Sequence, residues 1–203
     1  MIVTSLAQPV SRGARFAFLS AVLLVTTAAT DDANVADYSI ASIEYLPSPL
    51  EKIGKLQAGL LCLPKGKLRW RDVARPGDHA IAARVEDVLR SGGLSVAPQP
   101  DPLYGDAPPA TLYRIRVVVT VVTLRLCVAG DVLFVGKVGP PPYTRGTITV
   151  RWETYDRFAR QKIDAVTYAM PVDDRAADAR TASHVLSNAI EASAVRYAVS
   201  RPR

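Results

Sequence analysis

The segment Leu112–Val128 (LYRIRVVVTVVTLRLCV) limits the possible folds more than any other part of the chain. Apolar side chains occupy the odd positions from Tyr113 to Val121 and the even positions from Val122 to Val128, an alternation typical of a half-buried strand. A change of parity inside one strand requires a bulge, a strong bend or cover on both faces. The sequence therefore predicts one long strand that is irregular near its middle.

A hairpin is predicted after this strand. Gly146–Tyr155 alternates, so that the even-numbered side chains of Ile148–Trp152 face the core and Glu153 faces solvent. Ile163–Met170 follows a polar turn and is expected to pair with it.

Two helices are also predicted, one before and one after these strands. The first is capped by Asp78, whose carboxylate can accept the free amide protons of the first turn, and it ends at Gly92-Gly93. The second is capped by Asp173 or Asp174. The apolar stripes are Ile81, Val85, Val88 and Leu89 in the first helix, and Val185, Leu186, Ala189, Ile190 and Tyr197 in the second.

These elements predict an α+β fold, a two-layer sandwich with two helices on one face of a mostly antiparallel sheet. The expected divisions are a signal peptide at 1–29, a mobile N-terminal segment with one short strand at 30–55, and a single α+β domain at 56–203. Within the domain, Gly59–Leu63 (GLLCL) is interpreted as a buried strand and Lys67–Val73 as its return arm.

The first 29 residues are typical of a secretory signal peptide. Arg12 and Arg15 precede the apolar run Phe16–Ala29, no acidic residue occurs before Asp31, and Thr27-Ala28-Ala29 offers small side chains for cleavage. The run is 14 residues long, shorter than the about 20 of a spanning helix, so no stable membrane span is expected after cleavage. We therefore expect a periplasmic or secreted protein.

Charge and cysteine content refine this expectation. The net charge is +6, and loss of Arg12 and Arg15 with the signal leaves +4, a mildly basic balance that favours anionic partners. Nucleic acid is not expected as a partner outside the cytoplasm. We favour a disulfide between Cys62 and Cys127, the alternative being two separate buried thiols.

Patterns for catalysis or metal binding are not found in the sequence. His79 and His184 fall at or inside predicted helices, there is no G-x-S-x-G turn, and the adjacent helical residues Ser183 and His184 do not face each other. Zinc, calcium and phosphate-loop spacings are missing as well, so no metal or cofactor is predicted. Glu153 and Asp164 are a candidate carboxylate pair, although both fit a solvent face.

The cluster with a distinct chemical character is Pro64–Asp72 (PKGKLRWRD). In an extended chain its four basic side chains share one face, and Leu68 and Trp70 share the other and anchor the core. Such a basic ladder suits phosphate or carboxylate groups, whereas the alternative is a charged edge strand that prevents pairing with other chains. The candidate binding residues are Lys65, Lys67, Arg69, Trp70 and Arg71.

The segment GTITVRWETYDRFARQKIDAVTYAM and the final helix resemble small bacterial periplasmic proteins. The residues that carry the resemblance are Trp152, Tyr155, Asp156, Val166 and the helix Val185–Tyr197. Over residues 56–200 the order of elements is similar to the lipoprotein-like domains of envelope-assembly and transport-auxiliary proteins. The resemblance implies a non-enzymatic accessory role in the envelope. The chain departs from these families because no lipid-attachment cysteine follows the signal.

Together, these observations predict an exported, non-enzymatic interaction or assembly module that binds an envelope protein or an anionic glycolipid. Recognition is expected to use the basic ladder or addition of a strand at a sheet edge, with Pro98–Pro109 and Pro140–Pro142 as further contact surfaces. The alternative is an exported hydrolase whose site is assembled from residues far apart in the sequence.

Overall fold

The strand predicted at Leu112–Val128 is β4 (Tyr113–Val128), and its irregularity lies where the parity of the apolar residues changes. The register between β4 and β7 shifts between Val119 and Val121, so one extra residue of β4 bulges out of the pairing. The alternating buried side chains are Ile115, Val117 and Val119 before the bulge, and Val122, Leu124 and Leu126 after it. The predicted change of parity is therefore confirmed as a bulge.

The computed structural model describes residues 36–59, 61–73, 77–99, 111–128, 130–132, 136–138, 143–175 and 181–201. In chain order the elements are β1 (Tyr38–Tyr45), β2 (Lys52–Ala58), β3 (Leu63–Arg69), the 3₁₀ helix η1 (Trp70–Asp72), α1 (Asp78–Ser91), β4 (Tyr113–Val128), β5 (Gly130–Val132), β6 (Gly136–Val138), β7 (Tyr143–Asp156), β8 (Gln161–Asp174) and α2 (Thr181–Val199).

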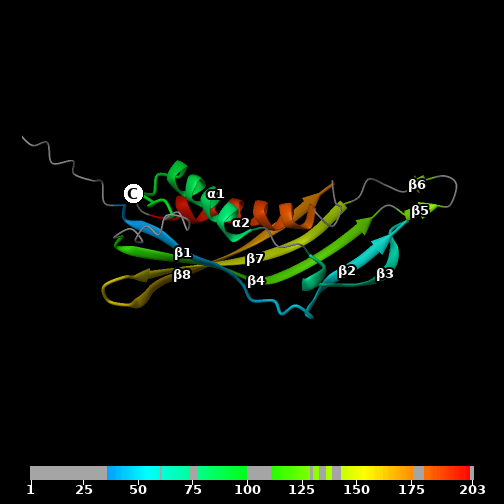
Figure 1. Ribbon diagram of the computed structural model, residues 1–203, viewed down its shortest axis with the longest axis horizontal. Helices are drawn as coiled ribbons and strands as arrows, with labels where there is room; N and C mark the ends of the chain where they lie inside the picture. Colours follow the sequence, from blue (N-terminus) through cyan, green and yellow to red (C-terminus); the bar gives the residue numbers. More distant parts are fainter. Residues whose placement is uncertain are drawn as a thin grey trace, which may run out of the picture. The chain divides into compact units, whose positions relative to one another are not determined.

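One edge of β4 is shared by two strands placed end to end. β1 pairs in parallel with its first part, from Tyr38 opposite Tyr113, and β2 pairs in parallel with its last part, up to Ala58 opposite Val128. β3 continues the sheet beside β2, and β7 and β8 form an antiparallel hairpin on the other edge of β4 (Figure 1). β5 and β6 pair only with each other. The sheet is thus mostly antiparallel, as predicted.

Both helices lie on the same face of the sheet (Figure 1). α2 packs on β7 and β8, and α1 packs on α2 and β1. Side chains of β7 bond directly to α2: Trp152 Nε1 donates to Ser193 Oγ at 3.0 Å, and the hydroxyls of Thr154 and Tyr197 are 2.6 Å apart. The rings of Trp152 and Tyr197 stack with centroids 4.7 Å apart. This confirms the two-layer α+β architecture. Neither helix in the described part of the chain lies on the opposite face of the sheet, which we call the helix-free face.

The predicted helical stripes are confirmed, but the predicted caps are not. Ile81, Val85 and Leu89 and the predicted residues of α2 are buried, with Val88 partly buried. The N-cap of α1 is Gly77, and Asp78 is already the first helical residue. Asp173 and Asp174 end β8 rather than cap α2, because both still pair with β7.

Gly59–Leu63 is not the buried strand that its apolar composition predicts. Its described residues 59, 61 and 62 lie in the turn between β2 and β3, where Leu61 is 76% exposed, and Leu63, the first residue of β3, is 63% exposed. Cys62 adopts a positive φ of 50°, and its N–H donates to Gly59 O at 3.1 Å, which closes the turn. Local turn geometry therefore outweighs the tendency of these leucines to be buried.

A disulfide joins this turn to the end of β4. Cys62 and Cys127 are bonded, with their Cα atoms 5.6 Å apart, as the sequence analysis favours. In the chain-entropy model, a cross-link across such a long loop contributes about 4 kcal/mol to stability. The bond therefore holds the β2–β3 hairpin against the central strand.

The predicted boundary at residue 56 falls inside β2. Residues 38–55 include β1, whose Ile40 and Ile43 are 6% and 8% exposed in the core, so this stretch belongs to the sheet and not to a mobile segment. The expected signal peptide at 1–29 lies outside the described residues, as do Pro140–Pro142 and most of Pro98–Pro109.

Candidate functional site

The basic ladder predicted from the sequence lies on β3 at the edge of the sheet. Lys65, Lys67 and Arg69 are all exposed, and Leu68 between them is 3% exposed and contributes to the core. The register of β3 against β2 shifts beside Lys65, which has no cross-strand partner. Three of the predicted binding residues therefore share an accessible strand.

The other two predicted residues lie beyond the end of β3, in η1. Trp70 is 3% exposed, and its ring centroid is 5.5 Å from that of Tyr45, so it anchors the hairpin and offers no binding surface. Arg71 Nε is 3.8 Å from Asp72 Oδ1. The strand ends at Arg69 because η1 begins there, which removes Arg71 from the predicted ladder.

The structure extends the ladder sideways across the sheet. Lys67 lies opposite Lys55 on β2, Lys55 lies opposite Arg125 on β4, and Arg125 lies opposite Arg145 on β7. Residues that are paired directly across strands point to the same face, and neighbouring strands lie about 4.8 Å apart. We call these four exposed cations the basic row; it spans about 14 Å on the helix-free face.

Within the basic row, only Arg145 has an acidic partner in the described part of the chain. Its Nε is 3.0 Å from Asp173 Oδ1 on β8. Lys67, Lys55 and Arg125 face one another without a carboxylate in contact, and like charges placed directly opposite destabilise a sheet. A bound anion would relieve the repulsion between these exposed cations, so the basic row is suited to binding anions.

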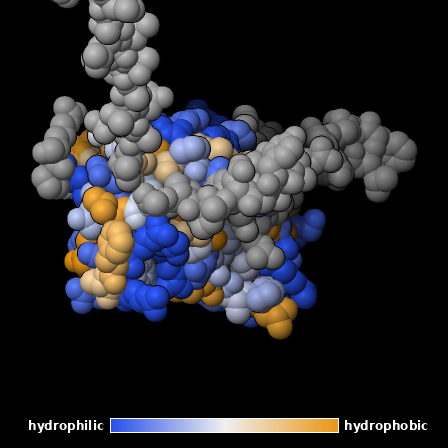
Figure 2. Space-filling view, turned by 60° about the vertical axis from the view of Figure 1, so that its left-hand side comes forward, coloured by the Kyte–Doolittle hydropathy of each residue, from blue (hydrophilic) through white to orange (hydrophobic). Residues whose placement is uncertain are grey.

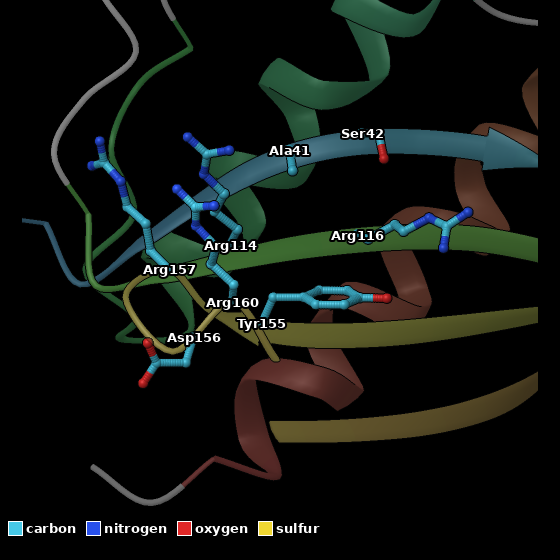
Figure 3. A pocket seen from close by; sticks show the side chains of 8 residues that line it. All are labelled: Ala41, Ser42, Arg114, Arg116, Tyr155, Asp156, Arg157 and Arg160. Atoms are coloured by element: carbon cyan, nitrogen blue, oxygen red, sulfur yellow. The ribbon is translucent and has the colours of Figure 1, made fainter. Parts of the chain in front are cut away.

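An arginine cleft lies at the other end of the helix-free face, where β4 begins and β7 ends. It is an open depression of about 530 Å³. Its basic lining residues are Arg114 and Arg116 from β4 and Arg157 and Arg160 from the β7–β8 turn, with Ala41, Ser42, Tyr155 and Asp156 completing it. Figure 3 shows the side chains of Arg114, Arg157 and Arg160 extending to the same side, with the carboxylate of Asp156 directed away from them.

The β7–β8 turn holds two of these arginines in place. Asp156 Oδ1 accepts the backbone N–H groups of Phe158 and Ala159, both at 2.8 Å, so this carboxylate serves the turn itself. Arg160 has a φ of 53°, in the left-handed region, which costs a non-glycine residue roughly 1–2 kcal/mol. Phe158 between the two arginines is 77% exposed.

Beside the cleft, Arg116 belongs to a charged network. It bonds to Glu44 on β1 through Nε at 2.8 Å and through Nη2, and its Nη1 is 3.3 Å from Glu153 Oε2 on β7. Tyr155 also donates to Glu153, at 2.8 Å. Because Arg116 already contacts two carboxylates, its charge is largely compensated within the protein.

Glu153 is 2% exposed, so the expectation that it faces solvent is wrong. It does lie on the helix-free face, but the side chains of Arg116, Arg151 and Lys162 cover it. Burial by itself raises the pKa of Glu153, whereas the Tyr155 hydrogen bond and these three cations lower it, and the net result is a pKa below the usual value. The carboxylate is therefore held ionised.

The residues considered for catalysis do not come together in the described part of the chain. His79 and His184 are exposed on separate helices. Asp164 bonds to Arg201 on the helix-covered face, and Glu153 lies on the opposite face, so they do not act as a carboxylate pair. Among the described residues there is no cluster of His, Cys, Asp or Glu suited to a metal, and none of the helices is long and apolar enough to cross a membrane.

Comparison with known proteins gives likenesses at the level of structure. The chain matches no protein-family model and no curated protein. A DUF330 protein from Xanthomonas campestris has a TM-score of 0.45 and 11% identity, with 80% of this chain and 81% of the other covered. The PelC dodecamer from Paraburkholderia phytofirmans has a TM-score of 0.35 and 11% identity, with 82% and 91% covered.

A protein from Helicobacter pylori described as a homologue of the neuraminyllactose-binding hemagglutinin has a TM-score of 0.38 and 8% identity, with 82% and 84% covered. A putative lipoprotein from Caulobacter crescentus and a minor lipoprotein from Acinetobacter baumannii are also among the matched structures. All of these TM-scores are below 0.5, so we draw nothing about function from them.

Proposed function

We propose that the chain is an exported, non-enzymatic module of the cell envelope that binds an anionic glycolipid surface through its helix-free face. The observation that carries this proposal is the basic row, in which Lys67, Lys55 and Arg125 are directly opposed and none contacts a carboxylate among the described residues. Export rests on the signal peptide predicted at 1–29.

The exposed leucines of the β2–β3 turn favour a lipid layer over an acidic protein face. Leu61 and Leu63 are 76% and 63% exposed beside the basic ladder, so the same hairpin offers both apolar and cationic groups. Peripheral attachment to anionic membranes uses this combination of buried apolar area and electrostatic attraction. Figure 2 brings forward the end of the molecule opposite this hairpin, where hydrophobic side chains appear as separate patches among hydrophilic ones.

The hydrolase alternative gains no support from the described residues. The arginine cleft contains no histidine, and its one acidic lining residue, Asp156, is engaged in the turn. Ser42 in the lining donates to Glu44 Oε1 at 2.9 Å, but Arg116 also bonds this carboxylate and holds its pKa below the usual value, which makes Glu44 a poor general base.

Co-sedimentation of the purified mature protein with vesicles tests the proposal. We expect binding to vesicles containing phosphatidylglycerol, little binding to phosphatidylcholine alone, and a steep loss with added salt. A cation near such a surface contributes about 1 kcal/mol, so Lys55→Gln, Lys67→Gln and Arg125→Gln should each weaken binding about fivefold.

Two matched variants serve as controls. Arg145→Gln removes a charge that Asp173 already compensates, and Arg196→Gln removes an exposed charge on α2, in the helical layer. Both should have smaller effects than Lys55→Gln. Equal binding by the wild type and the triple variant of Lys55, Lys67 and Arg125 would contradict the proposal, and capture of one envelope protein by in-cell crosslinking through β3 would favour a protein partner instead.

A further inference from the structure

The arginine cleft is separate from the basic row and lies at the opposite end of β4. Arg114 is the second residue of β4, whereas Arg125 is near its end. The cleft is formed because Tyr113 pairs with Asp156, which brings the β7–β8 turn beside the start of β4. A ligand of the cleft therefore does not need the basic row.

Two arginines of the cleft are available to a ligand. Within the described residues, the side chains of Arg114 and Arg160 form no hydrogen bond or ion pair, while the side chain of Arg116 is engaged by Glu44 and Glu153. Arg157 adds a third guanidinium on the same side in Figure 3. The acidic side chain in the lining, Asp156, accepts two backbone N–H groups, and Figure 3 shows its carboxylate directed away from Arg114 and Arg160.

The strained backbone conformation of Arg160 favours a binding role for its side chain. Its φ of 53° closes the turn before β8, a position that glycine fills without strain. No hydrogen bond or ion pair of its side chain with the described residues offsets this strain. A strained conformation that presents a free guanidinium into a cleft is typical of a binding position.

The charge and geometry select the class of ligand. A carboxylate has one charge and two oxygens, which a single arginine fork satisfies, whereas a phosphate monoester has close to two charges and three terminal oxygens for forks from two sides. The volume of about 530 Å³ exceeds a phosphate group and lies in the range of small-molecule sites. The phosphate should thus be attached to a larger body.

We propose that the arginine cleft binds a phosphate monoester, with Arg114 from β4 and Arg160 from the β7–β8 turn together holding the phosphoryl oxygens. The phosphate belongs either to a soluble molecule or to a lipid headgroup. Phe158, exposed between Arg157 and Arg160, is the group that would enter a lipid layer if the headgroup is the source.

Titration of the full mature protein with glycerol 3-phosphate and inorganic phosphate, followed by NMR or calorimetry, tests the site. We expect saturable one-to-one binding, with acetate far weaker. Arg114→Gln and Arg160→Gly should each weaken binding about tenfold or more, since each removes a charged hydrogen-bond donor. Arg160→Gly should fold at least as well as the wild type, because glycine relieves the strained φ, so loss of binding is not loss of fold.

Matched controls separate this site from the proposed function. Arg196→Gln and the triple variant of Lys55, Lys67 and Arg125 should bind glycerol 3-phosphate within about twofold of the wild type, since distant sites act independently. Phosphatidic acid vesicles identify the source of the phosphate. If Phe158→Ser weakens vesicle binding and leaves glycerol 3-phosphate binding unchanged, the ligand is a lipid headgroup; if both are unchanged, it is soluble.

Either result with Phe158→Ser supports the proposal. It is overturned if glycerol 3-phosphate shows no saturable binding, if acetate binds as tightly, or if Arg114→Gln and Arg160→Gly bind like the wild type.

Discussion

Lys55 on β2 lies directly opposite Arg125 on β4, and both side chains are exposed. Neither has an acidic partner among the described residues, and Lys67 faces Lys55 from the other side. The central strands of the sheet therefore contain repulsion that a single carboxylate would remove. The basic row is thus a place where stability and binding are expected to oppose each other.

Lys55→Glu should stabilise the protein and reduce its binding to anionic vesicles. The new carboxylate would lie between Lys67 and Arg125, and opposite charges across strands are each worth about 0.2–1 kcal/mol. We expect a higher urea midpoint at low salt and a smaller gain at high salt, where charges are screened. Arg196→Glu, on α2, is the control and should show no such gain; an unchanged midpoint for Lys55→Glu would mean that the row is not strained.

Glu153→Gln should flatten the dependence of stability on pH in the acid range. The folded pKa of Glu153 lies below its usual value of 4.5, so the carboxylate stabilises the fold above that pH, and this contribution is lost as the pH falls through the folded pKa. Burial raises the pKa of Glu86, which acts in the opposite direction but is common to both proteins.

Melting temperatures between pH 7 and pH 3 test this prediction. At neutral pH we expect Glu153→Gln to cost about 1–2 kcal/mol, because Arg116, Arg151 and Lys162 lose their shared acceptor charge. Glu51→Gln, an exposed carboxylate that accepts one backbone N–H from Ser48, should keep the wild-type slope. Parallel profiles for the wild type and Glu153→Gln would show that the network does not hold the charge as described.

Replacing both cysteines with serine should loosen the β2–β3 hairpin and lower global stability. Loss of the Cys62–Cys127 cross-link should cost up to about 4 kcal/mol in urea unfolding. The wild type in reductant should behave like the double variant, and the double variant itself should not respond to reductant. A double variant as stable as the oxidised wild type would show that the hairpin is held by its strand pairing alone.

Ser193→Ala should destabilise the contact between the helical layer and the sheet. Trp152 is fully buried, and Ser193 Oγ accepts its ring N–H, so the variant leaves a buried donor without a partner at a cost of about 1–3 kcal/mol. Ser200→Ala, at an exposed position just after α2, should cost much less. Chemical denaturation followed by tryptophan fluorescence measures both variants, and equal stabilities would mean that Trp152 finds another acceptor.

The alternation of apolar and polar residues made the main strands predictable, because successive side chains of a strand point to opposite faces of the sheet. The bulge of β4 was visible for the same reason, as the apolar side chains move from odd to even positions between Val119 and Val122. The alternation does not show what covers a face, so it predicts a solvent-facing Glu153, although cationic side chains bury this residue. Nor does it distinguish a turn made of apolar residues from a buried strand, and the prediction of a strand at Gly59–Leu63 is wrong for this reason.

The functional sites were only partly predictable, since they depend on register between distant strands. Lys65, Lys67 and Arg69 are close in sequence and were found, but Lys55 and Arg125 join them only through pairing across β2 and β4. Arg114 and Arg160 are brought together by the pairing of Tyr113 with Asp156. The available signal was two arginines flanking an aromatic residue in a polar turn, which by itself indicates no ligand.

β1 and β2 lie end to end along β4. We therefore expect the part of the sheet around β1 and the part around β2 and β3 to have different free energies of local unfolding. Releasing β2 from Leu124–Val128 breaks no hydrogen bond between β1 and Tyr113–Val119, and the helices pack on β1, β7 and β8 rather than on the hairpin. Amide hydrogen exchange should therefore report a slow-exchanging unit around Trp152 and a faster one in β2 and β3. Because the Cys62–Cys127 disulfide ties the turn of the hairpin to the end of β4, this opening lets β2 and β3 rearrange without detaching the hairpin from β4.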